Sequence, residues 1–207
     1  MIETLSLMDP WVIATFIGAS ILLYLTPGAD MMFVIASGIA GGPKSGLAAT
    51  AGVILGVACQ VILAAAGLAL LIAASPIALD VIRYAGAAYL AWLAWHSWRS
   101  TGTPDTRKGR ADLWRAFRRG LVTNLLNPKV ILFILAFLPQ FVDPAIGPEW
   151  QQILILGIIF AIGGFIADGL IGIFAGLAAD KVRKSTHTMN KLSAVIFGAL
   201  AARLAWN

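Results

Sequence analysis

Long apolar stretches, each close to the length of a membrane-spanning helix, follow one another along this chain. A helix needs about 20 consecutive apolar residues to cross a bilayer, and the pattern predicts six such helices rather than the alternating strands of a barrel. The predicted spans cover residues 11–41, 46–74, 77–98, 120–141, 151–178 and 190–206. From Leu192 to Trp206 a helix reaches only about 22 Å, so a five-span topology remains an alternative.

Two of these spans are interrupted by a proline that follows a residue suited to cap a helix. The interrupting segments read Thr26-Pro27-Gly28-Ala29-Asp30 in the first span and Asn127-Pro128-Lys129 in the fourth. Proline lacks a backbone N–H and suits the first helical position, while Thr and Asn are good N-caps. We therefore expect a half-helix to begin inside the membrane at each interruption. Paired broken helices commonly mark the substrate site of a transporter, because free N–H groups at a helix start attract anions.

The matched interruptions divide the chain into two halves of three spans each. Because an odd number of spans precedes the second half, equivalent helices of the two halves run in opposite directions. We expect an all-α membrane protein whose six transmembrane helices form a 3+3 inverted repeat, with the first and fourth helices broken at Pro27 and Pro128. The single transporter domain covers residues 1–207, with a first half of about 1–99, a basic cytoplasmic loop at 100–119 and a second half of about 120–207.

Composition and charge support a membrane protein and suggest its orientation. The 207 residues are 59% hydrophobic and 12% charged, and the mean hydropathy is +0.86. The first, third and fifth connections hold 12 of the 15 Lys and Arg residues. Basic residues accumulate on the cytoplasmic side, so we expect both termini to lie outside. Topology thus explains the net charge of +5 without nucleic acid, and the basic third connection is expected to contact anionic membrane lipid.

Three charged side chains are expected at depth within the apolar spans: Asp30, Lys129 and Asp168. Each costs about 2.5–3.5 kcal/mol on insertion scales unless it is paired or hydrated. A zwitterionic substrate could place its carboxylate near Lys129 and its ammonium near Asp30. Asp168 is the candidate proton carrier, with Asp30 as a second proton-coupling group, because apolar surroundings disfavour the charged form of a carboxylate.

Each of these assignments has a simpler alternative. Asp30 could complement the dipole of its helix in a hydrated loop, Lys129 could snorkel to the headgroups, and Asp168 could be a static partner of a buried donor. Asn124 and Asn127 could face a cavity or form interhelical hydrogen bonds. The glycine pairs could likewise serve packing within one bundle or a homodimer; these pairs are Gly52/Gly56 and Gly172/Gly176.

Other function classes lack their motifs. The segment Gly38–Ser45 resembles a phosphate loop, but a proline separates its glycine from its lysine. The two histidines, His96 and His187, and the single Cys59 are far apart in sequence, so no metal-site spacing is present. We therefore expect no enzymatic catalysis, no metal site and no cofactor, and any transport must draw on an ion gradient.

Several motifs together resemble the LysE/RhtB family of bacterial amino-acid exporters. They are Leu-Thr-Pro-Gly-Ala-Asp at 25–30, Arg-Tyr-Ala-Gly-Ala-Ala-Tyr-Leu at 83–90, Asn-Leu-Leu-Asn-Pro-Lys at 124–129 and Leu-Pro-Gln-Phe at 138–141. The family usually has a second proline where Ala29 stands. The resemblance implies a six-helix protein of the bacterial inner membrane that exports amino acids such as lysine, homoserine, threonine or leucine, driven by the proton motive force.

The sequence therefore predicts a secondary exporter of neutral or basic amino acids, working by proton antiport. The alternatives are an exporter of another small solute or cation on the same scaffold, and a membrane subunit without transport activity. The predicted substrate-binding residues are those of the two interruptions together with Asn124: Thr26, Pro27, Gly28, Asp30, Asn124, Asn127, Pro128 and Lys129.

Overall fold

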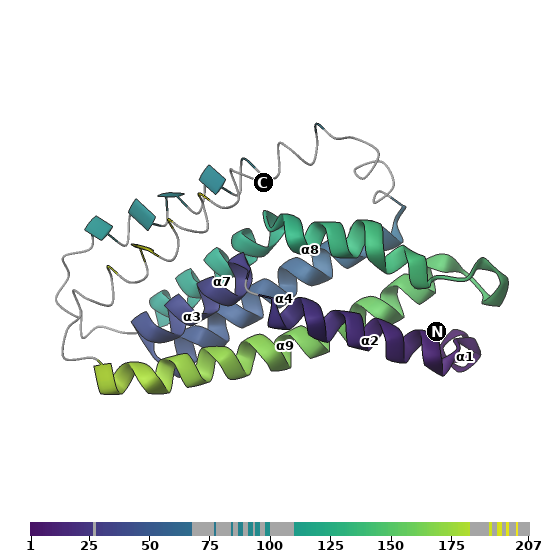
Figure 1. The fold of residues 1–207 in the computed structure, drawn as a ribbon, viewed down its shortest axis with the longest axis horizontal. Coiled ribbons are helices and arrows are strands. Elements are labelled where there is room, and N and C mark those ends of the chain that lie inside the picture. The colour runs from purple at the N-terminus through teal and green to yellow at the C-terminus, as the bar shows by residue number, and fades with distance from the viewer. Residues whose placement is uncertain are drawn as a thin grey trace.

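The computed structural model describes residues 1–26, 28–67 and 110–182, together with isolated positions between 77 and 99 and between 191 and 202. Every segment of regular structure within these residues is a helix (Figure 1). The predicted third and sixth spans lie largely outside the described residues, as does Pro27. The all-helical class is therefore confirmed for the described part, while the number of spans and the 3+3 inverted repeat stay predictions.

The described helices account for four of the predicted spans. Two single helices, α4 and α9, are long and apolar enough to cross a membrane, and two bent pairs could each make one further span. The bend is 54° between α2 and α3 and 52° at the break that follows α7. The elements are α1 (Ile2–Leu7), α2 (Pro10–Leu25), α3 (Ala29–Gly41), α4 (Pro43–Ala65), α7 (Arg110–Leu125), α8 (Pro128–Leu132), the π-helix η1 (Phe133–Phe137), the 3-10 helices η2 (Leu138–Phe141) and η3 (Pro144–Ile146), and α9 (Glu149–Val182).

The two breaks have different caps. Asn127 is the N-cap of α8 and its Oδ1 accepts the backbone N–H of Lys129 at 3.1 Å, as predicted. The corresponding prediction for Thr26 is wrong, because α3 begins only at Ala29 with Gly28 as its N-cap. Thr26 instead ends α2, and its hydroxyl donates back to the carbonyl of Leu22 at 2.8 Å. The Thr26 side chain therefore belongs to the end of α2, and α3 has no side-chain cap.

Two helix boundaries also differ from the prediction. The helix α4 ends at Ala65, well before the predicted end of the second span, and Gly67 follows in the left-handed region with φ of 78°. Glycine enters that region without steric cost, so it is a common helix terminator. The helix α7 begins at Arg110, inside the predicted basic loop, and continues without interruption to Leu125.

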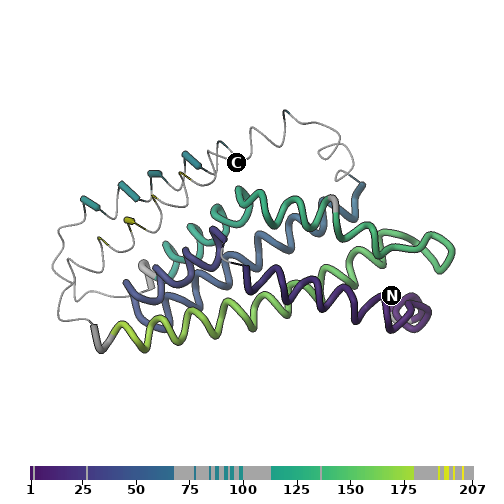
Figure 2. Tube along the Cα trace, in the orientation of Figure 1, coloured from purple at the N-terminus to yellow at the C-terminus, as the bar shows by residue number. Residues whose placement is uncertain are grey.

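The helix α9 runs along the length of the bundle and packs against α2, α3 and α4, while α4 packs against α7 (Figures 1 and 2). Glycines make the closest of these contacts. A Cβ at Gly52 would overlap the carbonyl oxygen of Phe117, and one at Gly172 would lie 2.9 Å from a Val34 side-chain carbon. Both predicted glycine pairs thus serve packing within the chain, which was the simpler of the two alternatives.

Buried apolar side chains form two clusters along the bundle. The aromatic cluster contains Phe16, Phe133 and Phe160, with ring centroids 5.8 Å apart for Phe16–Phe133 and 4.8 Å apart for Phe133–Phe160. The small-residue cluster lies around α3 and the first half of α4, and it contains Ala29, Phe33, Val34, Ala36, Ala49, Val53 and Ala116. The two helix breaks lie between these two clusters.

The helix ends that carry the basic and acidic residues named below lie at opposite ends of the bundle, as the path of the helices in Figure 1 shows. The start of α4 and the first half of α7 lie at one end and carry Lys44, Arg115 and Arg118. The opposite end holds α1 and the start of α9, with Glu3 and Glu149. This distribution follows the predicted positive-inside arrangement, while the sidedness of the membrane itself stays a prediction.

The glycine contact between α4 and α7 predicts a difference between two glycine variants. Gly52→Ala should lower the free energy of unfolding by about 1–3 kcal/mol, because its methyl group would overlap the backbone of Phe117. Gly18→Ala is the matched control, since nothing lies within 4 Å of its added Cβ. That control should be neutral or slightly stabilising. Thermal unfolding in detergent, followed by circular dichroism, measures both; equal melting temperatures for the two variants would contradict this packing.

Candidate functional site

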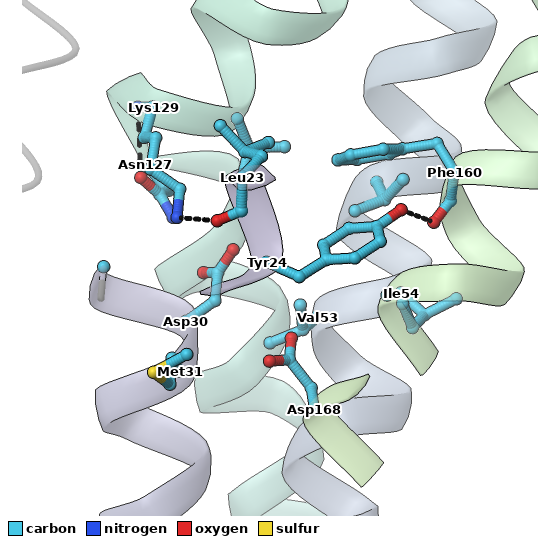
Figure 3. A pocket seen from close by; sticks show the side chains of 14 residues that line it. Leu23, Tyr24, Asp30, Met31, Val53, Ile54, Asn127, Lys129, Phe160 and Asp168 are labelled. Atoms are coloured by element: carbon cyan, nitrogen blue, oxygen red, sulfur yellow. Dashed lines mark hydrogen bonds between the residues drawn. The ribbon is translucent and has the colours of Figure 1, made fainter. Parts of the chain in front are cut away.

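The two helix breaks and the middle of α9 line one small cavity between the aromatic cluster and the small-residue cluster (Figure 3). Its volume is about 40 Å³. Apolar walls come from α4 and α8, at Val53, Val57 and Val130. The polar and charged side chains that line it are Tyr24, Asp30, Asn127, Lys129 and Asp168.

Lys129 joins the second break to the first. Its Nζ donates to the carbonyl of Leu23 at 2.9 Å and to that of Thr26 at 2.7 Å. These carbonyls lie at the end of α2, where the backbone N–H of Thr26 is shared between Leu22 and Leu23 and the helix offers few further donors. The ammonium thus binds the end of α2 and does not extend to the headgroups, as the snorkelling alternative would require. Gly28 leaves room for it, since a Cβ there would lie 3.2 Å from Nζ.

Asp30 lies in the first turn of α3 and is buried, with 7% of its surface exposed. Its Oδ2 accepts a hydrogen bond of 2.8 Å from the Asn124 amide, while its Oδ1 has no hydrogen-bond partner. The hydrated-loop alternative for Asp30 is therefore wrong, because the side chain is enclosed between α3 and α7. A buried carboxylate oxygen without a partner is costly and points to a ligand, water or ion.

Asn124 connects Asp30 to α4. Gln60 donates through Nε2 to the backbone carbonyl of Asn124 at 2.9 Å and to its Oδ1 at 3.2 Å. Gly56 permits this approach, since a Cβ at that position would lie 2.5 Å from the same Oδ1. Asn124 therefore forms interhelical hydrogen bonds and reaches the cavity through Asp30.

Asn127 adds a donor to the cavity. Its Oδ1 caps α8, but its buried Nδ2 has no hydrogen-bond partner. The acceptor Asp30 Oδ1 and the donor Asn127 Nδ2 thus line the same cavity without a well-formed hydrogen bond, and the two side chains are close enough to interact with each other. A zwitterion has the complementary groups, an ammonium that donates and a carboxylate that accepts.

The carboxylate of Asp168 faces the cavity from α9 (Figure 3). Tyr24, which our sequence analysis did not single out, lies beside it and donates its hydroxyl to the carbonyl of Phe160 at 2.6 Å. One signal was available: a tyrosine inside the first span, two residues before its interruption, carries a hydroxyl that needs a partner at depth.

The remaining predicted residues act through the backbone or lie outside the described chain. Thr26 is exposed and contributes its carbonyl to Lys129. Pro128 is the first residue of α8, and Pro27 is outside the described residues. The structure thus brings Gly28, Asp30, Asn127, Lys129 and Asp168 to one cavity.

Comparison with known proteins gives a match over nearly the whole chain. The sequence model of a family described as LysE type translocator matches residues 21–207. The leucine efflux protein of Salmonella typhimurium (strain LT2) is 32% identical over 200 residues, which cover 92% of this chain and 93% of that protein. Leucine efflux proteins of Klebsiella pneumoniae and Enterobacter sp. (strain 638) are 33% and 34% identical, with the same two coverages. No solved structure gives a significant match.

The hydrogen bond between Asn124 and Asp30 predicts energetic coupling between the two residues. Asn124→Ala should lower the free energy of unfolding by about 1–3 kcal/mol, because it removes the partner of a buried carboxylate. In an Asp30→Ala background the same change should cost at least about 0.5 kcal/mol less. Thermal unfolding of the four proteins in detergent measures this difference.

Leu125→Ala is the matched control for this cycle. It truncates the neighbouring residue of α7, which is exposed and outside the polar network. Its cost should be the same in both backgrounds. An Asn124→Ala cost that does not depend on Asp30 would show that the bond contributes nothing to stability.

Proposed function

Because this chain belongs to the LysE type translocator family, we propose that it is a secondary exporter of amino acids. We propose neutral amino acids of the leucine type as its substrates, proton antiport as its energy source and the bacterial inner membrane as its location. The leucine efflux proteins to which the chain is similar support this substrate class. The single observation that carries the proposal is the cavity at which the charged residues of both helix breaks meet.

In the proposed binding mode, the two ends of a zwitterion bind the two breaks. The substrate ammonium donates to the unpartnered Oδ1 of Asp30, and the carboxylate accepts from Nδ2 of Asn127. The positive charge of Lys129 lies on the carboxylate side, although two carbonyls hold its ammonium. The first free N–H groups of α3 add positive potential at the same place. Each buried group that lacks a partner in the empty site would then gain one.

Size indicates that the site opens before it binds. One water needs about 10–15 Å³ of space open to a water-sized sphere, so a cavity of about 40 Å³ holds a few waters and is smaller than an amino acid. Val57, Val130 and Phe160 of the aromatic cluster line the cavity on one side, and Val53 of the small-residue cluster lines it on the other.

Proton coupling is proposed to use Asp168 together with Asp30. Both carboxylates line the cavity that is proposed to bind the substrate ammonium. A proton and an ammonium then compete for the same negative charge, which is the requirement for exchanging one for the other. Asp168 would take up a proton when the substrate leaves and release it on the cytoplasmic side before the next substrate binds.

The charged residues of the breaks predict a strong loss of transport when they are neutralised. Asp30→Asn and Lys129→Ala should each reduce efflux of radiolabelled leucine from loaded proteoliposomes at least tenfold under an imposed pH gradient. The exposed charges Glu3 and Lys44 provide matched controls, and Glu3→Gln and Lys44→Ala should transport at the wild-type rate. Full export by both cavity variants would refute the site.

The same assay separates the alternatives. Wild-type vesicles that export no amino acid but release another solute or a cation would indicate a different cargo on this scaffold. Vesicles that release nothing beyond the protein-free background would indicate a membrane subunit without transport activity.

The proposed proton carrier predicts a change in pH dependence. Asp168→Asn should abolish the stimulation of leucine efflux by a pH gradient while leaving exchange of internal for external leucine measurable, because exchange needs no net proton movement. Asp143→Asn is the control, since Asp143 lies between η2 and η3 and caps a 3-10 turn away from the cavity. Unchanged gradient dependence in Asp168→Asn would exclude the carrier role.

A further inference from the structure

An apolar groove lies between α2 and α9, next to the polar cavity. Its volume is about 330 Å³. Ile17, Ile21 and Leu25 of α2 form one wall, and Ile159 and Ile166 of α9 form the other. The groove also contains Ser20, whose hydroxyl donates to the carbonyl of Phe16 in its own helix at 2.8 Å, so that hydroxyl proton is already engaged.

Tyr24 is the residue that the groove shares with the polar cavity. Its ring packs against bare backbone of α9: a Cβ at Gly163 would lie 2.9 Å from Cε2, and one at Gly164 would lie 3.6 Å from Cε1. The hydroxyl bond to the carbonyl of Phe160 fixes the ring in this position. Figure 3 shows the ring above Asp168, pointing from α2 toward α9. One aromatic ring thus stands between the charged cavity and the apolar groove.

We propose that this groove is the subsite for the aliphatic side chain of the transported amino acid, and that Tyr24 opens it to the polar cavity. The inference rests on the proposed export function and adds a determinant of substrate choice. When the hydroxyl leaves the Phe160 carbonyl and the ring turns aside, cavity and groove join. The zwitterionic end of the substrate then occupies the cavity, and its branched side chain lies between α2 and α9.

Volume and chemistry both favour this occupant. The polar cavity is smaller than a whole amino acid, and the groove beside it adds about 330 Å³, although it is open along the side where Ile21, Leu25 and Ile166 are exposed. Its walls offer apolar contact beside the charged end of the site, which is the distribution of polarity in leucine. A charged or amide side chain would lose its hydration there without gaining a partner.

Filling the groove should change substrate preference. Ala167 lines the groove from α9, so Ala167→Leu should lower the rate of leucine efflux at least fivefold while changing alanine efflux less than twofold. Ala178→Leu is the matched control, because Ala178 is exposed on the same helix and does not line the groove. Both rates should stay at wild-type values in that control. Elution as a single peak in detergent establishes that each variant is folded.

Two further variants keep the test decisive if Ala167→Leu does not fold. Ile21→Ala enlarges the groove and should raise phenylalanine efflux relative to leucine efflux at least threefold. Tyr24→Phe keeps the ring but removes the hydroxyl bond that holds it closed. It should therefore raise leucine efflux relative to alanine efflux at least twofold, since less free energy is needed to reach the open form.

The possible failures are distinguishable. A wild-type protein that exports no amino acid would refute the proposed function itself. A wild-type protein that exports leucine, with leucine-to-alanine ratios unchanged in the groove variants, would refute only the subsite. Loss of co-purified lipid or a changed oligomeric state in Ala167→Leu, with both efflux rates altered equally, would show that a lipid chain or a second copy occupies the groove and would overturn the inference.

Discussion

Two carbonyl groups at the end of α2, those of Leu23 and Thr26, accept hydrogen bonds from Lys129 at a depth where water is scarce. A break in a membrane helix is tolerable only when its freed backbone groups find partners. Here the partner comes from the other break, more than 100 residues later in the sequence. The same contact that stabilises the first interruption therefore fixes its position beside the second. The proposed binding site is a result of this pairing.

A second set of contacts holds the opposite side of the cavity. Gln60 binds Asn124, and Asn124 binds Asp30, so α4, α7 and α3 are joined by consecutive side-chain hydrogen bonds. A glycine makes this possible, because Gly56 has no side chain and the amide of Asn124 can therefore approach α4. The network uses one oxygen of the Asp30 carboxylate and leaves the other toward the cavity. The same few residues thus pack the helices together, pair most of their buried polar groups and leave Asp30 Oδ1 available at the cavity.

The features that could be predicted from the sequence are those that cost free energy in a membrane. Proline and buried charge in apolar runs are rare enough to identify Asp30, Lys129 and Asp168, and the capping role of Asn127 followed from local chemistry. What it did not predict depends on helix rotation and on competition between partners. Tyr24 could equally have been an interfacial aromatic residue, and only the arrangement of α2 on α9 directs it toward Phe160. Thr26 had two possible hydrogen-bond partners, the carbonyl of Leu22 in its own helix and an N–H group of the next helix. The local sequence does not decide between them, and in the structure its hydroxyl binds Leu22.

The contact between α4 and α7 has a mechanical consequence. Backbone meets backbone at Gly52 and Gly120, with no flexible side chain between them to absorb a displacement. Sliding or rolling one helix over the other would drive carbonyl oxygens into neighbouring backbone atoms. We therefore expect α4 and α7 to move as one rigid unit. The same kind of contact holds α9 against α3 and α4, because a Cβ at Gly38 or Gly46 would lie 2.5 or 2.7 Å from the carbonyl oxygen of Gly172. In the proposed transport cycle, α3, α4, α7 and α9 would therefore move together, and the 54° bend between α2 and α3 would be the place where the site opens.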